Sequence, residues 1–97
     1  MNWPSTLVSY KKTDIFTEDT LPAGLQQSHR TKGGVWALIR ILEGELQFQL
    51  EGGMPEILSR SNPGLVEPDL PHHIEAVGPV RFYIEFFRDA SSTEYEE

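Results

Sequence analysis

The stretch LQFQL, residues 46–50, alternates apolar and polar residues without interruption, and this pattern decides the fold class. A period of two places one row of side chains in the core and the other toward solvent, as in a half-buried β-strand. The stretch RFYIEFF, residues 81–87, repeats the pattern with Phe82, Ile84 and Phe86 on one face. Both stretches therefore predict strands.

The neighbouring segments extend this prediction to the whole chain. Further strands are expected at residues 35–42, 56–60, 65–67 and 72–77, and the connections between strands at residues 43–45, 51–55 and 62–64. These connections contain the Gly and Pro residues that tight turns require. The stretch from Ser5 to Leu21 reads as strand and loop. Short strands at this spacing predict an all-β sandwich or barrel.

Length and charge exclude several classes of protein. The chain has 97 residues and a net charge of −7, with no cysteine. We expect a single domain over residues 1–97, with a core at about 6–88 and an acidic tail at 89–97. The acidic balance argues against nucleic-acid binding, and the absence of cysteine excludes disulfides and thiolate metal sites. A cytoplasmic protein is expected, because no signal peptide or membrane span is evident, and homodimerisation would enlarge a small core.

The three histidines are the candidate functional residues. Alternation places His72 on the same row as Ile74, whereas His73 lies on the opposite face. His29 and His72 are predicted to face one interior, where two imidazoles and a carboxylate would suit a metal ion. The alternative is that both are strand histidines whose ring nitrogens bond to backbone groups or neighbouring acids.

The motifs PAGL (22–25), HRT (29–31), EGEL (43–46), PG (63–64) and PHH (71–73) resemble the two motifs of the cupin superfamily, and HRTKGGVW (29–36) and VRFYIEFFR (80–88) extend the likeness. More narrowly, they resemble the small cupins related to the N-terminal domain of tellurite-resistance protein B. The resemblance covers about residues 20–88 and implies a jelly-roll barrel. It also implies a role in resistance to tellurite or related toxic oxyanions.

The cupin motifs imply four metal ligands, of which this chain keeps two. His29 and His72 match histidine positions, whereas Thr31 and Ala37 replace the other two. A carboxylate would have to complete a site for Zn, Fe, Mn or Ni. Glu85 is the first candidate for this ligand. The alternates for the site are His73, Glu67 and Glu75.

Four further residues are candidates for lining a ligand pocket: Arg30, Trp36, Arg81 and Tyr83. Arginine can bind an anion through two parallel hydrogen bonds, and aromatic rings can stack on a ligand. The alternative is that the arginines are solvated and the aromatic residues belong to the core.

Three functions remain open from the sequence. The first is a stress-resistance module that binds a metal, a small molecule or an oxyanion in the barrel, alone or beside a methyltransferase chain. Longer relatives join such a domain to an S-adenosylmethionine-dependent methyltransferase, for which this chain has neither the room nor a glycine-rich cofactor loop. The second is a metal-dependent cupin oxygenase or isomerase. The third is a dimeric interaction module with a vestigial pocket.

Overall fold

The computed structural model describes residues 5–26 and 34–89. The elements are β1 (Leu7–Lys12), β2 (Phe16–Thr17), the short 3₁₀ helix η1 (Ala23–Gln26), β3 (Val35–Leu50), β4 (Glu56–Leu58), β5 (Gly64–Val66) and β6 (His72–Asp89). The predicted all-β class is confirmed. Within the described ranges, no helix has the length and apolar character to cross a membrane.

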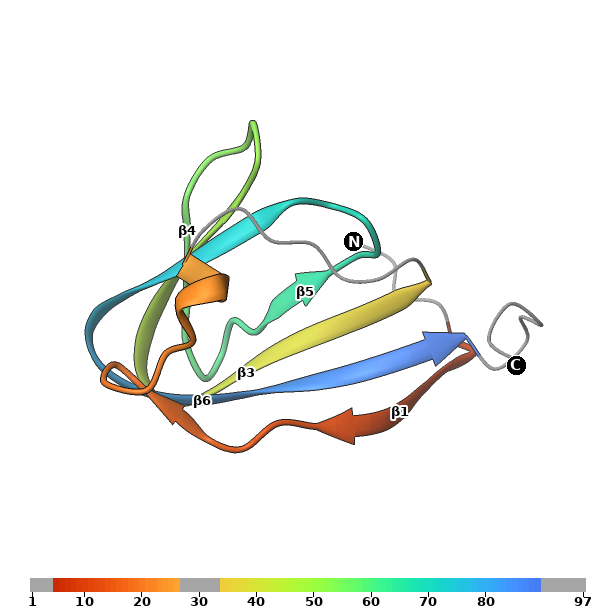
Figure 1. The fold of residues 1–97 in the computed structure, drawn as a ribbon, viewed down its shortest axis with the longest axis horizontal. Helices are drawn as coiled ribbons and strands as arrows, with labels where there is room; N and C mark the ends of the chain where they lie inside the picture. The colour runs from red at the N-terminus through yellow and green to blue at the C-terminus, as the bar shows by residue number, and fades with distance from the viewer. Residues whose placement is uncertain (1–4, 27–33, 90–97) are drawn as a thin grey trace.

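One antiparallel sheet contains all six strands, in the order β1-β6-β3-β4, with β2 beside β6 and β5 beside β3. The long strands β3 and β6 pair from Val35 opposite Arg88 to Leu50 opposite His72. Figure 1 shows that β3 and β6 curve together, so that the sheet folds over and its two halves face each other. The inner face of this folded sheet encloses the core.

The predicted hairpin turn at residues 43–45 is wrong, because β3 continues through it as a single strand. Its pairing with β6 instead shifts register between Ile41 and Glu43 and again between Gly44 and Leu46. Gly44 has a φ of 81°, which fits a β-bulge that bends the strand. The predicted strands 72–77 and 81–87 likewise form one strand, β6. The expected connections at 51–55 and 62–64 do link β3 to β4 and β4 to β5.

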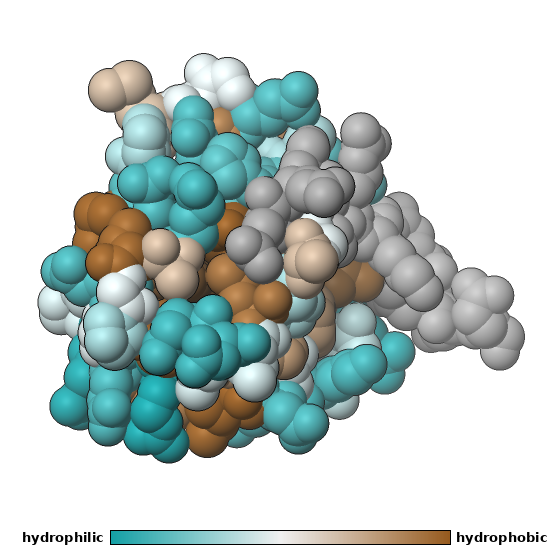
Figure 2. Space-filling model, turned by 60° about the vertical axis from the view of Figure 1, so that its left-hand side comes forward, coloured by the Kyte–Doolittle hydropathy of each residue, from teal (hydrophilic) through white to brown (hydrophobic). Residues whose placement is uncertain are grey.

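The core consists of the inward-facing rows of the long strands. Its buried residues are Ala37, Ile39, Ile41, Leu46, Phe48, Leu58, Val66, Ile74, Val80, Phe82 and Ile84. Phe82 is fully buried and packs against the ring of Phe16, with 5.6 Å between the ring centroids. On the face shown in Figure 2, hydrophobic residues form separate patches between hydrophilic ones. The apolar rows predicted from the period of two are therefore the rows that build the core.

Candidate functional site

A cavity of about 280 Å³ lies between the two halves of the folded sheet. Its wall consists of Thr13, Phe16, Pro22, Leu25, Ala37, Ile39, Val66, His72, Ile74, Ile84 and Phe86. These residues come from β2, β3, β5, β6, the η1 segment and the chain before β2. The cavity therefore depends on the folding of the whole sheet rather than on one local motif.

His72 brings an imidazole into this apolar wall. It stands at the start of β6 with only 6% of its surface exposed. Its Nδ1 lies 2.9 Å from the backbone oxygen of Leu70, and its ring lies beside Phe48. A carbonyl oxygen can only accept, so Nδ1–H is the donor, and in the neutral ring Nε2 carries the lone pair. This contact fixes both the orientation and the neutral tautomer of the ring.

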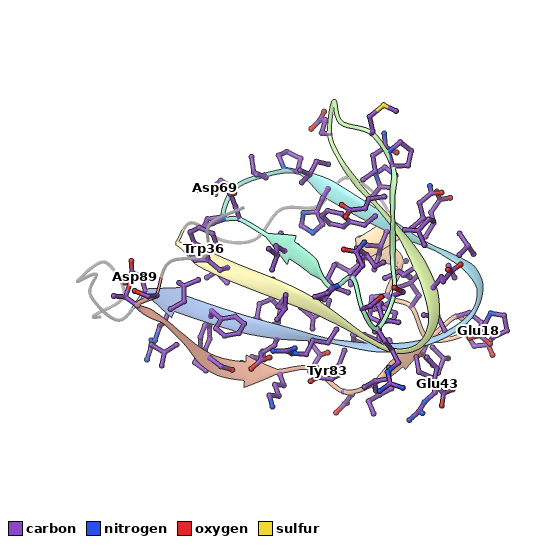
Figure 3. All side chains as sticks on the ribbon, turned by 180° about the vertical axis from the view of Figure 1, so that it is seen from behind. Glu18, Trp36, Glu43, Asp69, Tyr83 and Asp89 are labelled. Carbon is purple, nitrogen blue, oxygen red and sulfur yellow. The ribbon has the colours of Figure 1, made fainter. Side chains whose placement is uncertain are left out.

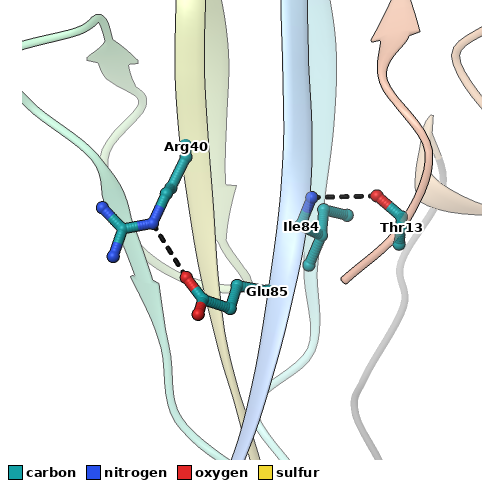
Figure 4. Close-up of polar contacts among 4 residues, drawn as sticks. All are labelled: Thr13, Arg40, Ile84 and Glu85. Carbon is teal, nitrogen blue, oxygen red and sulfur yellow. Dashed lines mark hydrogen bonds and ion pairs between the residues drawn. The ribbon is translucent and has the colours of Figure 1, made fainter. Parts of the chain in front are cut away.

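Thr13 supplies the other polar side chain among the described residues of the wall, and its hydroxyl has a structural role. The Oγ1 atom accepts a hydrogen bond from the backbone N–H of Ile84 at 3.0 Å (Figure 4). The Thr13 N–H donates to the Ile84 carbonyl at 2.9 Å. Oγ1 also donates to the carbonyl of Asp14. Thr13 therefore fastens the chain between β1 and β2 onto β6.

Glu85, the first candidate for a third metal ligand, lies on the opposite face of β6 from the cavity. Its neighbours Ile84 and Phe86 line the cavity, so alternation turns Glu85 to the outer face of the sheet. There its Oε1 accepts a hydrogen bond from Nε of Arg40 at 2.9 Å (Figure 4). The carboxylate is thus committed to an ion pair on the outer face and is not placed to share a metal with His72.

The surroundings of Glu85 keep it ionised. Burial opposes ionisation, but the hydrogen bonds from Arg40 and Ser9 and the positive charges of Arg40 and Lys12 outweigh it. The pKa of Glu85 is therefore lowered.

The alternate ligands also lie outside the cavity wall. Glu75 and His73 occupy positions of β6 next to Ile74, and Glu75 accepts a hydrogen bond from Gln47 at 3.1 Å. Glu67 follows Val66 and does not line the cavity. In the ranges 5–26 and 34–89, no three His, Asp or Glu side chains gather where they could hold a metal. His29 and Arg30 lie outside the described residues.

The remaining predicted pocket residues do not line the His72 cavity. Trp36 and Tyr83 precede the cavity-lining Ala37 and Ile84, and alternation places both on the outer face. Arg81 binds Glu43 at 3.1 Å, and both residues line a separate hollow. Figure 3 shows Glu18 and Glu43 at the opposite end of the molecule from Trp36.

A hydrogen bond between the Glu18 side chain and the backbone of β6 stabilises the hollow near Arg81. Glu18 accepts a hydrogen bond from the N–H of Val80 at 2.9 Å, and this bond lowers the pKa of the Glu18 carboxyl. The carboxylate thereby fixes the loop after β2 to β6. We assign this hollow a structural role.

Comparison with known proteins identifies the family. Residues 11–84 match the TehB-like domain. The chain belongs to the TehB-like domain family. This match covers most of the described sheet and every described residue of the cavity wall except Phe86, and it establishes the expected relation to tellurite-resistance protein B.

This chain is similar to proteins of different lengths. The probable S-adenosyl-L-methionine-dependent methyltransferase TehB of Haemophilus influenzae is 31% identical over an alignment of 77 residues, and the match covers 73% of this chain and 27% of TehB. The crystal structure of Haemophilus influenzae TehB superposes with a TM-score of 0.80 at 28% identity, covering 92% of this chain and 36% of that one. This chain thus spans about a quarter to a third of TehB.

A protein from Escherichia coli K12 has the same fold as a chain of similar length. Its crystal structure superposes with a TM-score of 0.80 at 21% identity, covering 90% of this chain and 95% of that one. At that identity the likeness establishes the fold alone.

Sequence reasoning missed most of the cavity wall. Pro22 and Leu25 appeared only as motif residues, and Thr13 and Val66 were not considered as site residues. The sequence did indicate one part of the cavity wall, because Ile84 and Phe86 lie in the alternating apolar row of β6. The contribution of Pro22 and Leu25 to the wall becomes apparent only in the folded sheet, because both residues precede β3.

Proposed function

We propose that this TehB-like domain is a small-molecule-binding module in resistance to tellurite and related toxic oxyanions. The observation that carries this proposal is the 280 Å³ cavity with His72 in its wall. A cavity close to the usual size of a ligand pocket, whose described wall is mainly apolar and includes an oriented imidazole, is typical of a ligand site. We also infer that the folded-over sheet is a small cupin-like barrel, since its interior holds the site.

The relatives suggest how such a module would act. TehB is a probable S-adenosyl-L-methionine-dependent methyltransferase, most of which lies outside the part matched by this chain. We propose that the module holds its ligand for a methyltransferase chain or acts alone. Homodimerisation and a cytoplasmic location remain predictions, which light scattering and cell fractionation would test.

Tellurite tolerance of cells expressing cavity variants tests this function. Val66→Phe places a ring in the cavity, whereas Val77→Phe makes the same change where the side chain is 49% exposed and away from the wall. We expect wild type and Val77→Phe to raise the tolerated tellurite concentration equally and Val66→Phe to lose the effect. Equal tolerance with folded Val66→Phe would contradict the proposal.

A metal-dependent cupin enzyme is the second candidate, and one observation favours it. The Nδ1–H of His72 donates to a backbone carbonyl, an arrangement that metal-ligating histidines commonly show. The described part of the chain supplies one imidazole to the cavity, whereas a catalytic site needs at least three protein ligands. We therefore derive no metal-dependent step, and His29 remains the proposed partner of His72.

Metal content decides this second candidate. Protein purified without a His tag, with His72→Ala in parallel, would be measured by elemental analysis. Near-stoichiometric Zn, Fe, Mn or Ni in the wild type alone supports the enzyme hypothesis. Equal background in both samples removes it.

A further inference from the structure

We propose that the His72 cavity takes a small organic carboxylate, whose apolar body lies in the cavity and whose carboxylate binds Arg88 beside it. This inference rests on the proposed function, since it names the class of ligand for the same site. Three observations carry it: the position of Arg88 along β6, the contact of its guanidinium with Tyr10, and its difference in ion pairing from other arginines of the sheet.

Arg88 lies one step beyond the cavity wall on the same face of the sheet. Phe86 lines the cavity and pairs across the sheet with Ala37, which also lines it. Arg88 follows Phe86 by two residues, so alternation directs its side chain to the same face, and its cross-strand partner is Val35. Two residues of a strand span about 6.6 Å, which is comparable with the length of an extended arginine side chain. A ligand that fills the cavity and extends past Phe86 therefore reaches the guanidinium.

The ring of Tyr10 holds the guanidinium of Arg88 in place. The pairing of β1 with β6 shifts register between Ser9 and Lys11, so Tyr10 is the extra residue of a β-bulge. Bulges re-aim a side chain, and here the Cζ atom of Arg88 lies 5.3 Å from the centroid of the Tyr10 ring. A guanidinium held over a ring has less freedom to lose on binding, and its N–H groups can still donate two parallel hydrogen bonds to a carboxylate.

Arg88 also differs in its ion pairing from two other arginines of the sheet. Arg40 binds Glu85 at 2.9 Å. Arg81 binds Glu43 at 3.1 Å. Within the part of the chain that the structure describes, no carboxylate forms an ion pair with Arg88. Its side chain is exposed, so a carboxylate bound there gains a cation and keeps its contact with water.

The cavity supplies the apolar half of the site. Its volume is about 280 Å³, whereas an engineered apolar cavity of roughly 150 Å³ already binds benzene. A phenyl ring with a short chain therefore fits, in contact with Ile39, Ile74 and Ile84. Burial of this apolar body supplies affinity, and Arg88 supplies the preference for an anion.

Calorimetric titration of the intact chain with two matched probes tests this ligand class. 4-Phenylbutyrate carries a carboxylate, and 4-phenyl-1-butanol has the same ring and chain with a hydroxyl. We expect the wild type to bind the acid at least as tightly as the alcohol. In Arg88→Gln the ratio of acid to alcohol affinity should fall about 3- to 10-fold, between the effects of an exposed ion pair and of a hydrogen bond to a charged group.

Arg60→Gln is the matched control for the loss of charge. Arg60 is an exposed arginine that follows β4 and does not line the cavity. Its replacement removes the same positive charge from the chain, so Arg60→Gln should keep the affinity ratio of the wild type. A ratio that falls equally in both variants would show a general effect of net charge and overturn the role of Arg88.

A second pair of variants locates the apolar body. Val66→Phe fills the cavity and should abolish binding of both probes, while Val77→Phe should leave it unchanged. If Val66→Phe does not fold, methyl NMR with 4-phenylbutyrate replaces it, and the shifts of Ile39, Ile74 and Ile84 should change on titration.

The outcomes separate the ligand class from the proposed function. An affinity ratio that stays unchanged in Arg88→Gln, or tighter binding of the alcohol by the wild type, would overturn the carboxylate class; loss of binding in Val66→Phe would then leave a binding cavity in place. Acid binding that persists in folded Val66→Phe but is lost in Arg88→Gln would place the ligand on the surface and overturn the proposal. Absence of binding by both probes to folded wild type would also overturn it, and the tellurite-tolerance assay would then decide the function separately.

Discussion

Replacement of Gly44 by alanine tests the continuous strand that folds the sheet over the cavity. An added Cβ would overlap the carbonyl oxygen of Pro79 and lie 3.1 Å from the Cα of Val80. Overpacking of this kind lowers the free energy of unfolding by about 1–3 kcal/mol. The φ of 81° adds about 1–2 kcal/mol for a residue with a side chain. We therefore expect Gly44→Ala to lower the free energy of unfolding by about 2–5 kcal/mol.

Gly52 provides a matched control for the backbone strain. It has a φ of 80°, but a Cβ there meets nothing within 4 Å. Gly52→Ala should therefore cost only the backbone part, about 1–2 kcal/mol. The gain from a stiffer unfolded chain is similar in both variants and cancels in the comparison.

Urea unfolding followed by tryptophan fluorescence measures both variants. We expect the midpoint of Gly44→Ala to fall well below that of Gly52→Ala with similar slopes. Equal loss of stability in the two variants would refute the close approach of β3 to Pro79. It would instead favour the open hairpin turn that the sequence predicts at residues 43–45.

Three more predictions concern other contacts. The lowered pKa of Glu85 stabilises the fold above the unfolded value near 4.5, and this contribution is lost as the pH falls through the lower folded value. Glu85→Gln should thus cost about 1–2 kcal/mol at pH 7 in urea unfolding, and the difference should shrink below pH 4.5; a constant difference would contradict this. Glu18→Ala should speed amide hydrogen exchange at Val80, whose N–H it binds, and an unchanged rate would argue against that bond. Phe82→Ala should cost about 3–5 kcal/mol in the same unfolding assay, whereas Met54→Ala, at a side chain 86% exposed, should change stability by less than about 0.5 kcal/mol; similar losses would contradict the assigned core.

The strands were predictable because alternation is a local signal, but their continuity was not. The LQFQL and RFYIEFF stretches lie in β3 and β6 as expected. Gly44 looked like a turn residue because glycine supplies a positive φ in both turns and bulges. The close approach of the Pro79 backbone to Gly44 distinguishes a bulge from a turn, and Pro79 is distant from Gly44 in sequence. Strands β3 and β6 are long because they bend together.

The alternation of side chains along a strand predicts the inward position of His72. The same alternation argues against Glu85 as a ligand. His72 shares a row with Ile74, so its inward position follows from the period of two. The same rule applied to Glu85 places it opposite Ile84 and Phe86, against its proposed role as a ligand. The apolar wall from the segments before β3 could not be predicted, since it is formed by contacts between distant parts of the chain.

The central claim is that the His72 cavity binds a small molecule. Its most direct test is a methyl NMR titration with cinnamyl alcohol, a small aromatic alcohol used as a probe of the cavity of about 280 Å³. Ile39, Ile74 and Ile84 line the cavity, whereas Ile15 and Ile57 are exposed away from it. We predict that the methyl shifts of the three cavity isoleucines change together with one dissociation constant, while the two exposed isoleucines stay in place. Shifts confined to Ile15 and Ile57, or no saturable shift at the cavity isoleucines, would contradict ligand binding in the His72 cavity.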